Sequence, residues 1–186
     1  MSAYIATYEG HRLDLLHPDP SKITIEGIAR GLSRECRFHN QTLMVYSVAQ
    51  HSIEVAMLCQ GREAQLWGLL HDAGEAYYRD LASLLKHELG GFWKAMEHAW
   101  LLMLATKFSL PLPIPKEVKQ ADKIMLAVER RLLLPQNEEI DRQFEFNESG
   151  LTVPDRHLKI MNCYEAELSY LTMFDRLYDK PKYNIA

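Results

Sequence analysis

The helical spacing of apolar residues between positions 47 and 134 constrains this chain more than any other feature of its sequence. Apolar side chains recur there at about every third or fourth position, as in an α-helix that buries one face. The prolines of PLPIP at 111–115 interrupt the pattern, because proline ends one helix and is tolerated in the first turn of the next. We predict helices over 47–59, 62–78, 91–108 and 114–134, with Trp93, Met96, Trp100 and Leu104 in the core. The expected fold class is therefore all-α.

The N-terminal part is expected to add a small β element and one short helix. Residues 4–16 alternate around Glu9-Gly10, a pattern that predicts a short β-hairpin. Thr24 is of a residue type that caps helix N-termini, so we expect a brief helix over 24–32.

The remaining segments complete a single domain over 1–186, with its core over 24–134. Residues 34–45 are polar and free of glycine, and we expect them to be irregular or to form a second short hairpin. An acidic, turn-rich loop is predicted over 137–153, followed by a long C-terminal helix over 155–177.

Composition excludes several classes of protein. A net charge of −4 argues against binding to a nucleic-acid polymer, which requires a basic face. No stretch approaches the ~20 apolar residues of a membrane span, and the N-terminus has no secretory pattern, so we expect a cytoplasmic protein with no membrane partner. Its three cysteines are scattered, which argues against a zinc ribbon or a disulfide framework.

The residues that bear on chemistry lie in the segments YSVAQHS, LLHDAGEAYYRD and KQADKIML. His71 and Asp72 are adjacent, and neighbouring helical residues point about 100° apart. The pair therefore needs a corner of the fold at which other helices supply further ligands, and His51 and Asp122 are candidates. Two imidazoles and two carboxylates suit a divalent transition ion, namely Zn, Co, Mn or Fe(II), with additional Mg²⁺ left open.

The ordered set AQHS, then LLHDAGEAY with a nearby RD, then a distal AD resembles the HD-domain phosphohydrolases. More narrowly, CRFHNQT…YSVAQHS and HDAGEAYYRDLASLLK resemble the phage and prophage branch of that family. That branch is akin to bacterial 5′-deoxynucleotidases and to the dATP triphosphohydrolase of phages that replace adenine in their DNA. The resemblance covers about residues 13–125, and it implies an HD-domain helical bundle.

The resemblance also implies roles for individual residues. Glu75 matches the catalytic glutamate of the family, and Asp80 matches a second acidic residue of this branch. Glu75 follows His71 by four positions, so we expect it on the same helix face as His71, within reach of a metal-bound water. The implied metal ligands are His51, His71, Asp72 and Asp122.

Four basic residues are candidates for binding the phosphates of a substrate. Lys86 and Lys119 resemble phosphate-contacting lysines of the dATP hydrolase, and Arg34 and Arg37 precede His51 and are expected to clamp phosphate. One departure concerns the nucleoside pocket, where the deoxynucleotidases carry Arg-Trp and this chain has Arg37-Phe38. The six other histidines, His98 among them, are expected to be structural or exposed.

The function expected from these residues is metal-dependent hydrolysis of a nucleotide, a small-molecule substrate. A deoxynucleoside triphosphate such as dATP would give the deoxynucleoside and triphosphate. A 5′-deoxynucleotidase acting on monophosphates, an inactive metal-binding regulatory module and hydrolysis of a signalling nucleotide stay open as alternatives. We also expect a homo-oligomer that packs through the apolar face of the last helix, formed by Tyr164, Leu168, Leu171 and Phe174.

Overall fold

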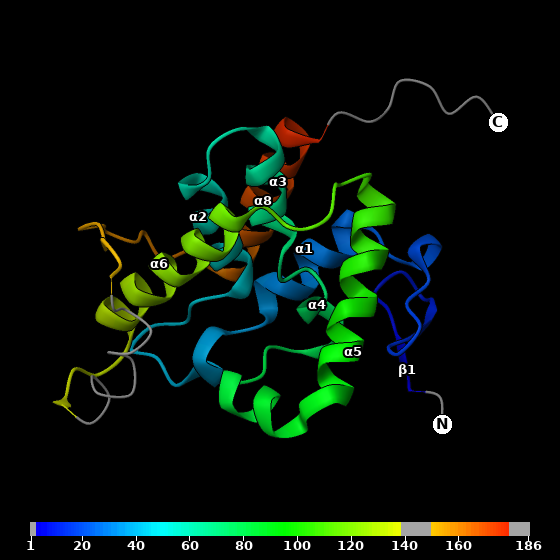
Figure 1. Cartoon of the computed structure of the whole chain (residues 1–186), viewed down its shortest axis with the longest axis horizontal. Helices are drawn as coiled ribbons and strands as arrows, with labels where there is room; N and C mark the ends of the chain where they lie inside the picture. Colours follow the sequence, from blue (N-terminus) through cyan, green and yellow to red (C-terminus); the bar gives the residue numbers. More distant parts are fainter. Residues whose placement is uncertain (1–2, 139–149, 179–186) are drawn as a thin grey trace.

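The structure, a computed structural model, describes residues 3–138 and 150–178 (Figure 1). Over these residues it is mostly helical with one two-stranded sheet, so the all-α prediction with a minor hairpin is confirmed. The strands are β1 (Tyr4–Ala6) and β2 (Arg12–Asp14). The α-helices are α1 (Ile25–Arg34), α2 (Val48–Leu58), α3 (Arg62–Leu70), α4 (Glu75–Tyr78), α5 (Ser83–Phe108), α6 (Lys116–Leu133) and α8 (Cys163–Leu177). None of the described helices is long and apolar enough to cross a membrane.

The N-terminal hairpin and the first helix form where the sequence predicts them. β1 and β2 pair antiparallel, with Tyr4 opposite Asp14, and Gly10 adopts a φ of 84° in the turn. Thr24 caps α1, since its side chain accepts a hydrogen bond from the backbone N–H of Gly27. The hairpin is tied to the long helix α5 because the indole of Trp100 donates to the Leu15 carbonyl at 2.8 Å.

The helices surround two neighbouring apolar clusters. The larger one joins α1, α2, α3, α5 and α8, and the smaller one lies between α2, α3, α5 and α6. The four core residues predicted on the 91–108 segment are all buried, which confirms that expectation. Of the four residues predicted to bind a partner subunit, Tyr164 and Leu168 are exposed, whereas Phe174 is buried against Phe108 inside the chain.

The helix predicted over 62–78 is wrong in one respect that matters for the site. It ends at Leu70, and a turn over 71–74 separates it from the short helix α4. The turn closes with hydrogen bonds three residues apart, from Ala73 N to the Leu70 carbonyl at 3.0 Å and from Glu75 N to the Asp72 carbonyl at 2.9 Å. Gly74 permits the turn to pack closely against Tyr78, because a Cβ atom at position 74 would lie 2.6 Å from the ring of Tyr78.

The helix predicted over 91–108 also begins earlier, at Ser83. Gly90 lies within it at a φ of 61°, a backbone conformation that favours glycine, and it kinks the helix instead of starting it. The segment 34–45 is irregular, as predicted. It contains a 3₁₀ turn over Arg37–Asn40 and is closed by a single antiparallel bridge between Cys36 and Ser47.

The last helix begins at Cys163 and not at Asp155 as predicted. Asn162 and Glu165 form a capping box at its start, which satisfies the free backbone N–H groups of the first turn. Upstream, the amide of Gln50 on α2 donates to the Lys159 carbonyl at 2.8 Å and accepts from Met161 N at 3.0 Å. These bonds tie the segment to α2, and residues 151–162 have no regular secondary structure. Most of the predicted loop over 137–153 lies outside the described residues.

Close helix packing generates a prediction about three glycines. A Cβ atom at Gly31 would lie 2.6–2.9 Å from atoms of Ala76 on α4, and one at Gly68 would lie 2.9 Å from the Ala56 Cα on α2. Gly31→Ala and Gly68→Ala should therefore each lower the free energy of unfolding by about 1–3 kcal/mol, as overpacking does. Gly91→Ala is the matched control, because a Cβ there meets nothing within 4 Å and alanine favours the helix by up to about 1 kcal/mol. Urea denaturation of the three variants measures this, and equal stability of all three would contradict the packing.

Candidate metal centre

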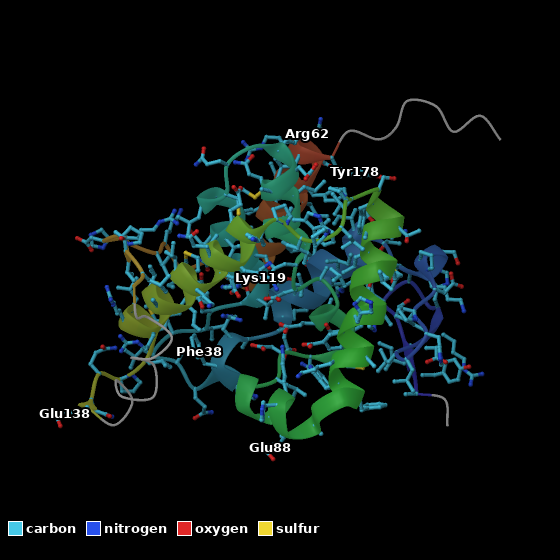
Figure 2. All side chains as sticks on the ribbon, in the orientation of Figure 1. Phe38, Arg62, Glu88, Lys119, Glu138 and Tyr178 are labelled. Atoms are coloured by element: carbon cyan, nitrogen blue, oxygen red, sulfur yellow. The ribbon has the colours of Figure 1, made fainter. Side chains whose placement is uncertain are left out.

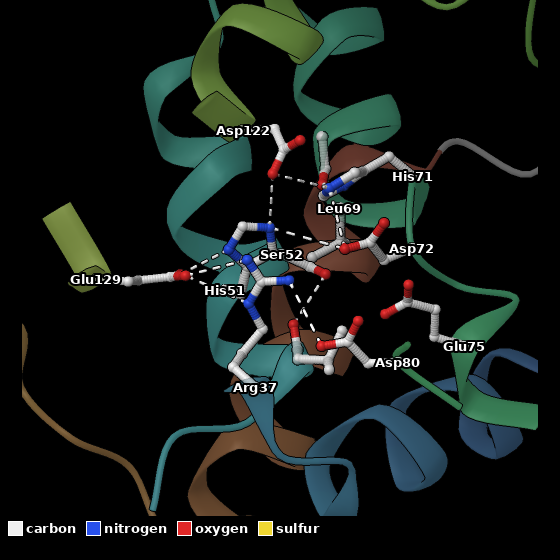
Figure 3. A network of polar contacts seen from close by, with 12 residues as sticks. Arg37, His51, Ser52, Leu69, His71, Asp72, Glu75, Asp80, Asp122 and Glu129 are labelled. Carbon is white, nitrogen blue, oxygen red and sulfur yellow. Dashed lines mark hydrogen bonds and ion pairs between the residues drawn. The ribbon is translucent and has the colours of Figure 1, made fainter. Parts of the chain in front are cut away.

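Four predicted ligands come together where α2, α6 and the turn after α3 meet (Figure 3). His51 extends from α2, Asp122 from α6, and His71 and Asp72 from the turn. His51 Nε2 lies 3.2 Å from Asp122 Oδ1 and 3.7 Å from Asp72 Oδ2. His71 Nε2 lies 3.3 Å from Asp72 Oδ2 and 3.9 Å from Asp122 Oδ1. Two imidazole nitrogens and a carboxylate oxygen of Asp122 thus lie close together, and the Asp72 carboxylate lies beside both imidazoles.

These distances fit a single bound ion. Ligand atoms about 2.1 Å from a tetrahedral zinc-like ion lie roughly 3.4 Å apart. The tightest group is formed by His51, His71 and Asp122, whose ligand atoms all lie within 4.8 Å of one another, and Asp72 flanks both imidazoles. Nε2 of each histidine is buried and has no hydrogen-bond partner among the described residues. Two buried nitrogens that have no hydrogen-bond partner and lie beside carboxylates are what a cation would satisfy.

Each imidazole is held by its other nitrogen. His71 donates from Nδ1 to the Gly68 carbonyl at 2.7 Å, and His51 donates from Nδ1 to Glu129 Oε1 at 2.6 Å. Both bonds place the proton on Nδ1, so the Nε2 lone pairs face the centre of the group. The two rings lie at an angle of 51° with their centroids 5.4 Å apart, so both can point their nitrogens at the same ion.

The electrostatics of the group favour positive charge. Burial and Arg37 act to lower the pKa of His51, but Glu129 and Asp122 outweigh them and raise it to about 10. Burial alone would raise the pKa of Asp122, yet the neighbouring imidazoles of His51 and His71 hold it well below its ordinary value. A divalent ion would take the place of the His51 proton, so its binding should weaken as the pH falls.

The two predicted catalytic carboxylates lie beside the ligands. Glu75 is buried at the start of α4, and its Oε1 lies 2.9 Å from the ammonium of Lys86. Burial raises the pKa of Glu75 well above its ordinary value, and the charges of Asp72 and Asp80 raise it further. Asp80 faces the guanidinium of Arg37 at 3.8 Å (Figure 3), and burial raises its pKa as well.

A cavity of about 310 Å³ opens from the ligand group toward α5. His71, Asp72 and Glu75 line one side of it. The α5 side carries Lys86, Lys94, Glu97 and His98 together with the apolar surfaces of Trp100, Leu101 and Leu104. The cavity therefore joins the candidate metal ligands to positively charged groups and to an apolar surface.

The four basic residues predicted to bind substrate take different positions. Lys86 lines the cavity, and its ammonium lies 2.9 Å from Glu75 Oε1 and 3.4 Å from Glu97 Oε1. Arg37 lies beneath the ligands, where its Nε and Nη2 contact Glu129 Oε2 at 3.3 and 3.1 Å. Arg34 points away from the site and binds Glu167 on α8 at 2.6 Å, so the structure does not bring it to the group. Lys119 lies on α6 (Figure 2), one turn before Asp122; it is exposed and is not among the residues that line the cavity.

Sequence reasoning missed Glu129, Lys94 and His98. Glu129 lies seven residues after Asp122, which is two turns of α6 and the same helix face, so an acidic residue on a buried face was the available signal. His98 is exposed, as expected, but it also lines the cavity, as Lys94 does. Nothing in the sequence pattern distinguishes these two from other exposed residues of α5.

Comparison with known proteins adds relatives but no activity. No family model matches the chain. The uncharacterized protein YfdR of Escherichia coli is 37% identical over 129 residues, which make up 69% of this chain and 71% of YfdR. An uncharacterized protein of Rhodobacter capsulatus is 36% identical over 131 residues, covering 66% of this chain and 67% of that protein. At this identity and coverage, the chain belongs to the same protein family as YfdR.

Proposed function

We propose that the protein is a metal-dependent phosphohydrolase of the HD type that acts on nucleotides. One observation carries the proposal: the buried Nε2 atoms of His51 and His71 face Asp72 and Asp122 without hydrogen bonds of their own. The buried carboxylate of Glu75 and a cavity of about 310 Å³ adjoin this group. Hydrolysis of a phosphate ester needs a cation for the phosphoryl oxygens, a proton acceptor for water and room for the ester.

The chain's own residues supply the remaining chemistry. A divalent transition ion held by the four ligands would polarise a phosphoryl oxygen and lower the pKa of water. Glu75 would accept the proton of the attacking water at a carboxylate oxygen, and burial, which raises its pKa, makes that carboxylate a stronger base. Lys86, whose ammonium lies 2.9 Å from Glu75 Oε1, would offset the charge that develops on the phosphate.

For the substrate we propose a deoxynucleoside triphosphate such as dATP, which would be split into the deoxynucleoside and triphosphate. The lysines along α5 support this choice, because Lys86 and Lys94 line the same cavity and outer phosphates need distant positive charge. The half-buried side chains of Leu101 and Ile114, which also line the cavity, offer an apolar surface for the nucleoside.

A second candidate is a 5′-nucleotidase for deoxynucleoside monophosphates. This candidate is favoured because two of the basic residues expected to bind substrate do not lie in the cavity. Arg34 is engaged by Glu167, and Lys119 is not among the residues that line it. A monophosphate at the ion would need neither residue.

The role of Glu75 generates one prediction. Glu75→Gln should retain the metal and the fold but lose about 10²–10⁴-fold in kcat, since positioned proton transfer contributes that much. Glu97→Gln is the matched control, because Glu97 also lines the cavity and also contacts Lys86, at 3.4 Å, but is not a proposed proton acceptor. Steady-state kinetics with Co²⁺ or Mn²⁺ measure both, and equal losses in the two variants would remove the role assigned to Glu75.

The substrate can be settled by product analysis combined with lysine variants. The wild type is incubated with dATP and dAMP, and triphosphate and phosphate are quantified separately. Lys94→Ala should lower kcat/KM for dATP by roughly ten- to a hundredfold if Lys94 contributes one charge-assisted contact of about 1.5–3 kcal/mol, whereas Lys119→Ala should change it little, because Lys119 does not line the cavity. Activity on dAMP should barely change, because a monophosphate at the ion does not reach distant cations.

Lys123→Ala provides the control for this comparison, since Lys123 is an exposed lysine next to Asp122 that does not line the cavity. If a lysine variant loses the same factor on both substrates, that lysine does not bind outer phosphates. A wild type that cleaves dAMP alone would establish the 5′-nucleotidase instead.

A further inference from the structure

A completely buried carboxylate lies directly behind the candidate metal centre. Glu129 of α6 has no exposed side-chain surface, and its two oxygens take different partners. Oε1 accepts the Nδ1 proton of His51 at 2.6 Å, whereas Oε2 accepts from Nε and Nη2 of Arg37 at 3.3 and 3.1 Å. The carboxylate thus joins the imidazole of His51 to a guanidinium (Figure 3).

Arg37 is far from Glu129 in the sequence, and backbone contacts hold it at this position. Arg37 N donates to the Tyr46 carbonyl at 2.9 Å, next to the bridge between Cys36 and Ser47, so the arginine is fixed to the start of α2. Its third guanidinium nitrogen, Nη1, lies 3.8 Å from Asp80 Oδ2. A continuous series of polar contacts therefore runs from Asp80 through Arg37 and Glu129 to His51.

We propose that Glu129 and Arg37 are positioning residues of the metal centre, and that Arg37 does this in place of clamping the substrate phosphate. Glu129 fixes the His51 ring with Nε2 toward the ligand group. Its negative charge also makes the His51 imidazole more basic and thus a stronger metal ligand. Arg37 donates to Oε2 and thereby holds the Glu129 carboxylate in the orientation in which Oε1 accepts the Nδ1 proton of His51. This inference rests on the metal centre of the proposed function, but it does not depend on which ester is hydrolysed.

A purely structural role explains the arrangement less well. Burying an ion pair usually contributes little net stability, because desolvation offsets the attraction. The chain also contains a second buried carboxylate with an arginine partner, Glu54 on α2, whose Oε2 lies 3.2 Å from Nη2 of Arg156. Among the described residues, no hydrogen bond or ion pair joins Glu54 to a candidate ligand. The Glu54 pair is therefore a matched control for the Glu129 pair.

The test measures Co²⁺ affinity by titration, with the visible absorption of bound Co²⁺ as the signal. Partners of metal-binding histidines typically contribute 10–100-fold in affinity, so Glu129→Gln should bind Co²⁺ about 10–100-fold more weakly and with an altered spectrum. Glu54→Gln should bind like the wild type, although both variants lose a buried charge. If Glu129→Gln binds as tightly as the wild type, or if Glu54→Gln loses as much, the inference is overturned.

A double variant guards against loss of folding in Glu129→Gln, where Arg37 stays buried with a weakened partner. Arg37→Met with Glu129→Gln removes both charges, and replacing a buried pair by groups of similar volume is often well tolerated. The double variant should show the same weakened Co²⁺ binding, and wild-type affinity in it would overturn the inference.

The outcomes also separate this inference from the proposed function. A wild type that binds no Co²⁺ overturns the metal centre and the inference together. Co²⁺ binding that depends on Glu129, found in a protein that hydrolyses no nucleotide, supports the inference and overturns the proposed function.

Discussion

The rest of the site depends on two buried imidazole nitrogens that have no hydrogen-bond partner among the described residues. Nε2 of His51 and Nε2 of His71 face the carboxylates of Asp72 and Asp122, and burying unpaired polar atoms is costly unless something binds them. The neighbouring carboxylates raise the proton affinity of His51, so the group favours positive charge. A divalent ion would bind both nitrogens and would supply the positive charge that the carboxylates favour.

The fold holds this group through the break between α3 and α4. Because the chain turns at 71–74, His71 and Asp72 both point toward His51, and Glu75 begins a new helix beside them. Gly74 allows the turn to pack against Tyr78, and Gly31 lets α1 lie directly on α4. Small residues at these contacts therefore position charged residues at the site.

Helical spacing was sufficient to predict the helical class, because it is a local pattern, whereas the residues that converge were predicted chiefly from the resemblance to the HD-domain phosphohydrolases. The sequence was not sufficient where contacts between residues far apart in the chain determine the local structure. The extended segment before α8 depends on hydrogen bonds from Gln50, which is more than a hundred residues away in the chain. Arg34 and Arg37 looked equivalent in sequence, yet α1 ends between them and they point to different partners, Glu167 and Glu129. Their roles and those of the other candidate residues stay predictions.

The metal centre itself is tested most directly by anomalous diffraction from crystals of the Co²⁺-loaded protein. The account predicts one strong anomalous peak within about 2.0–2.2 Å of Nε2 of His51, Nε2 of His71 and a carboxylate oxygen of Asp72 and of Asp122. The peak should disappear in crystals of Asp72→Ala, since removal of one of four ligands leaves too few donors to hold the ion. A peak elsewhere in the molecule, or full Co²⁺ occupancy in the Asp72→Ala crystals, would contradict the account.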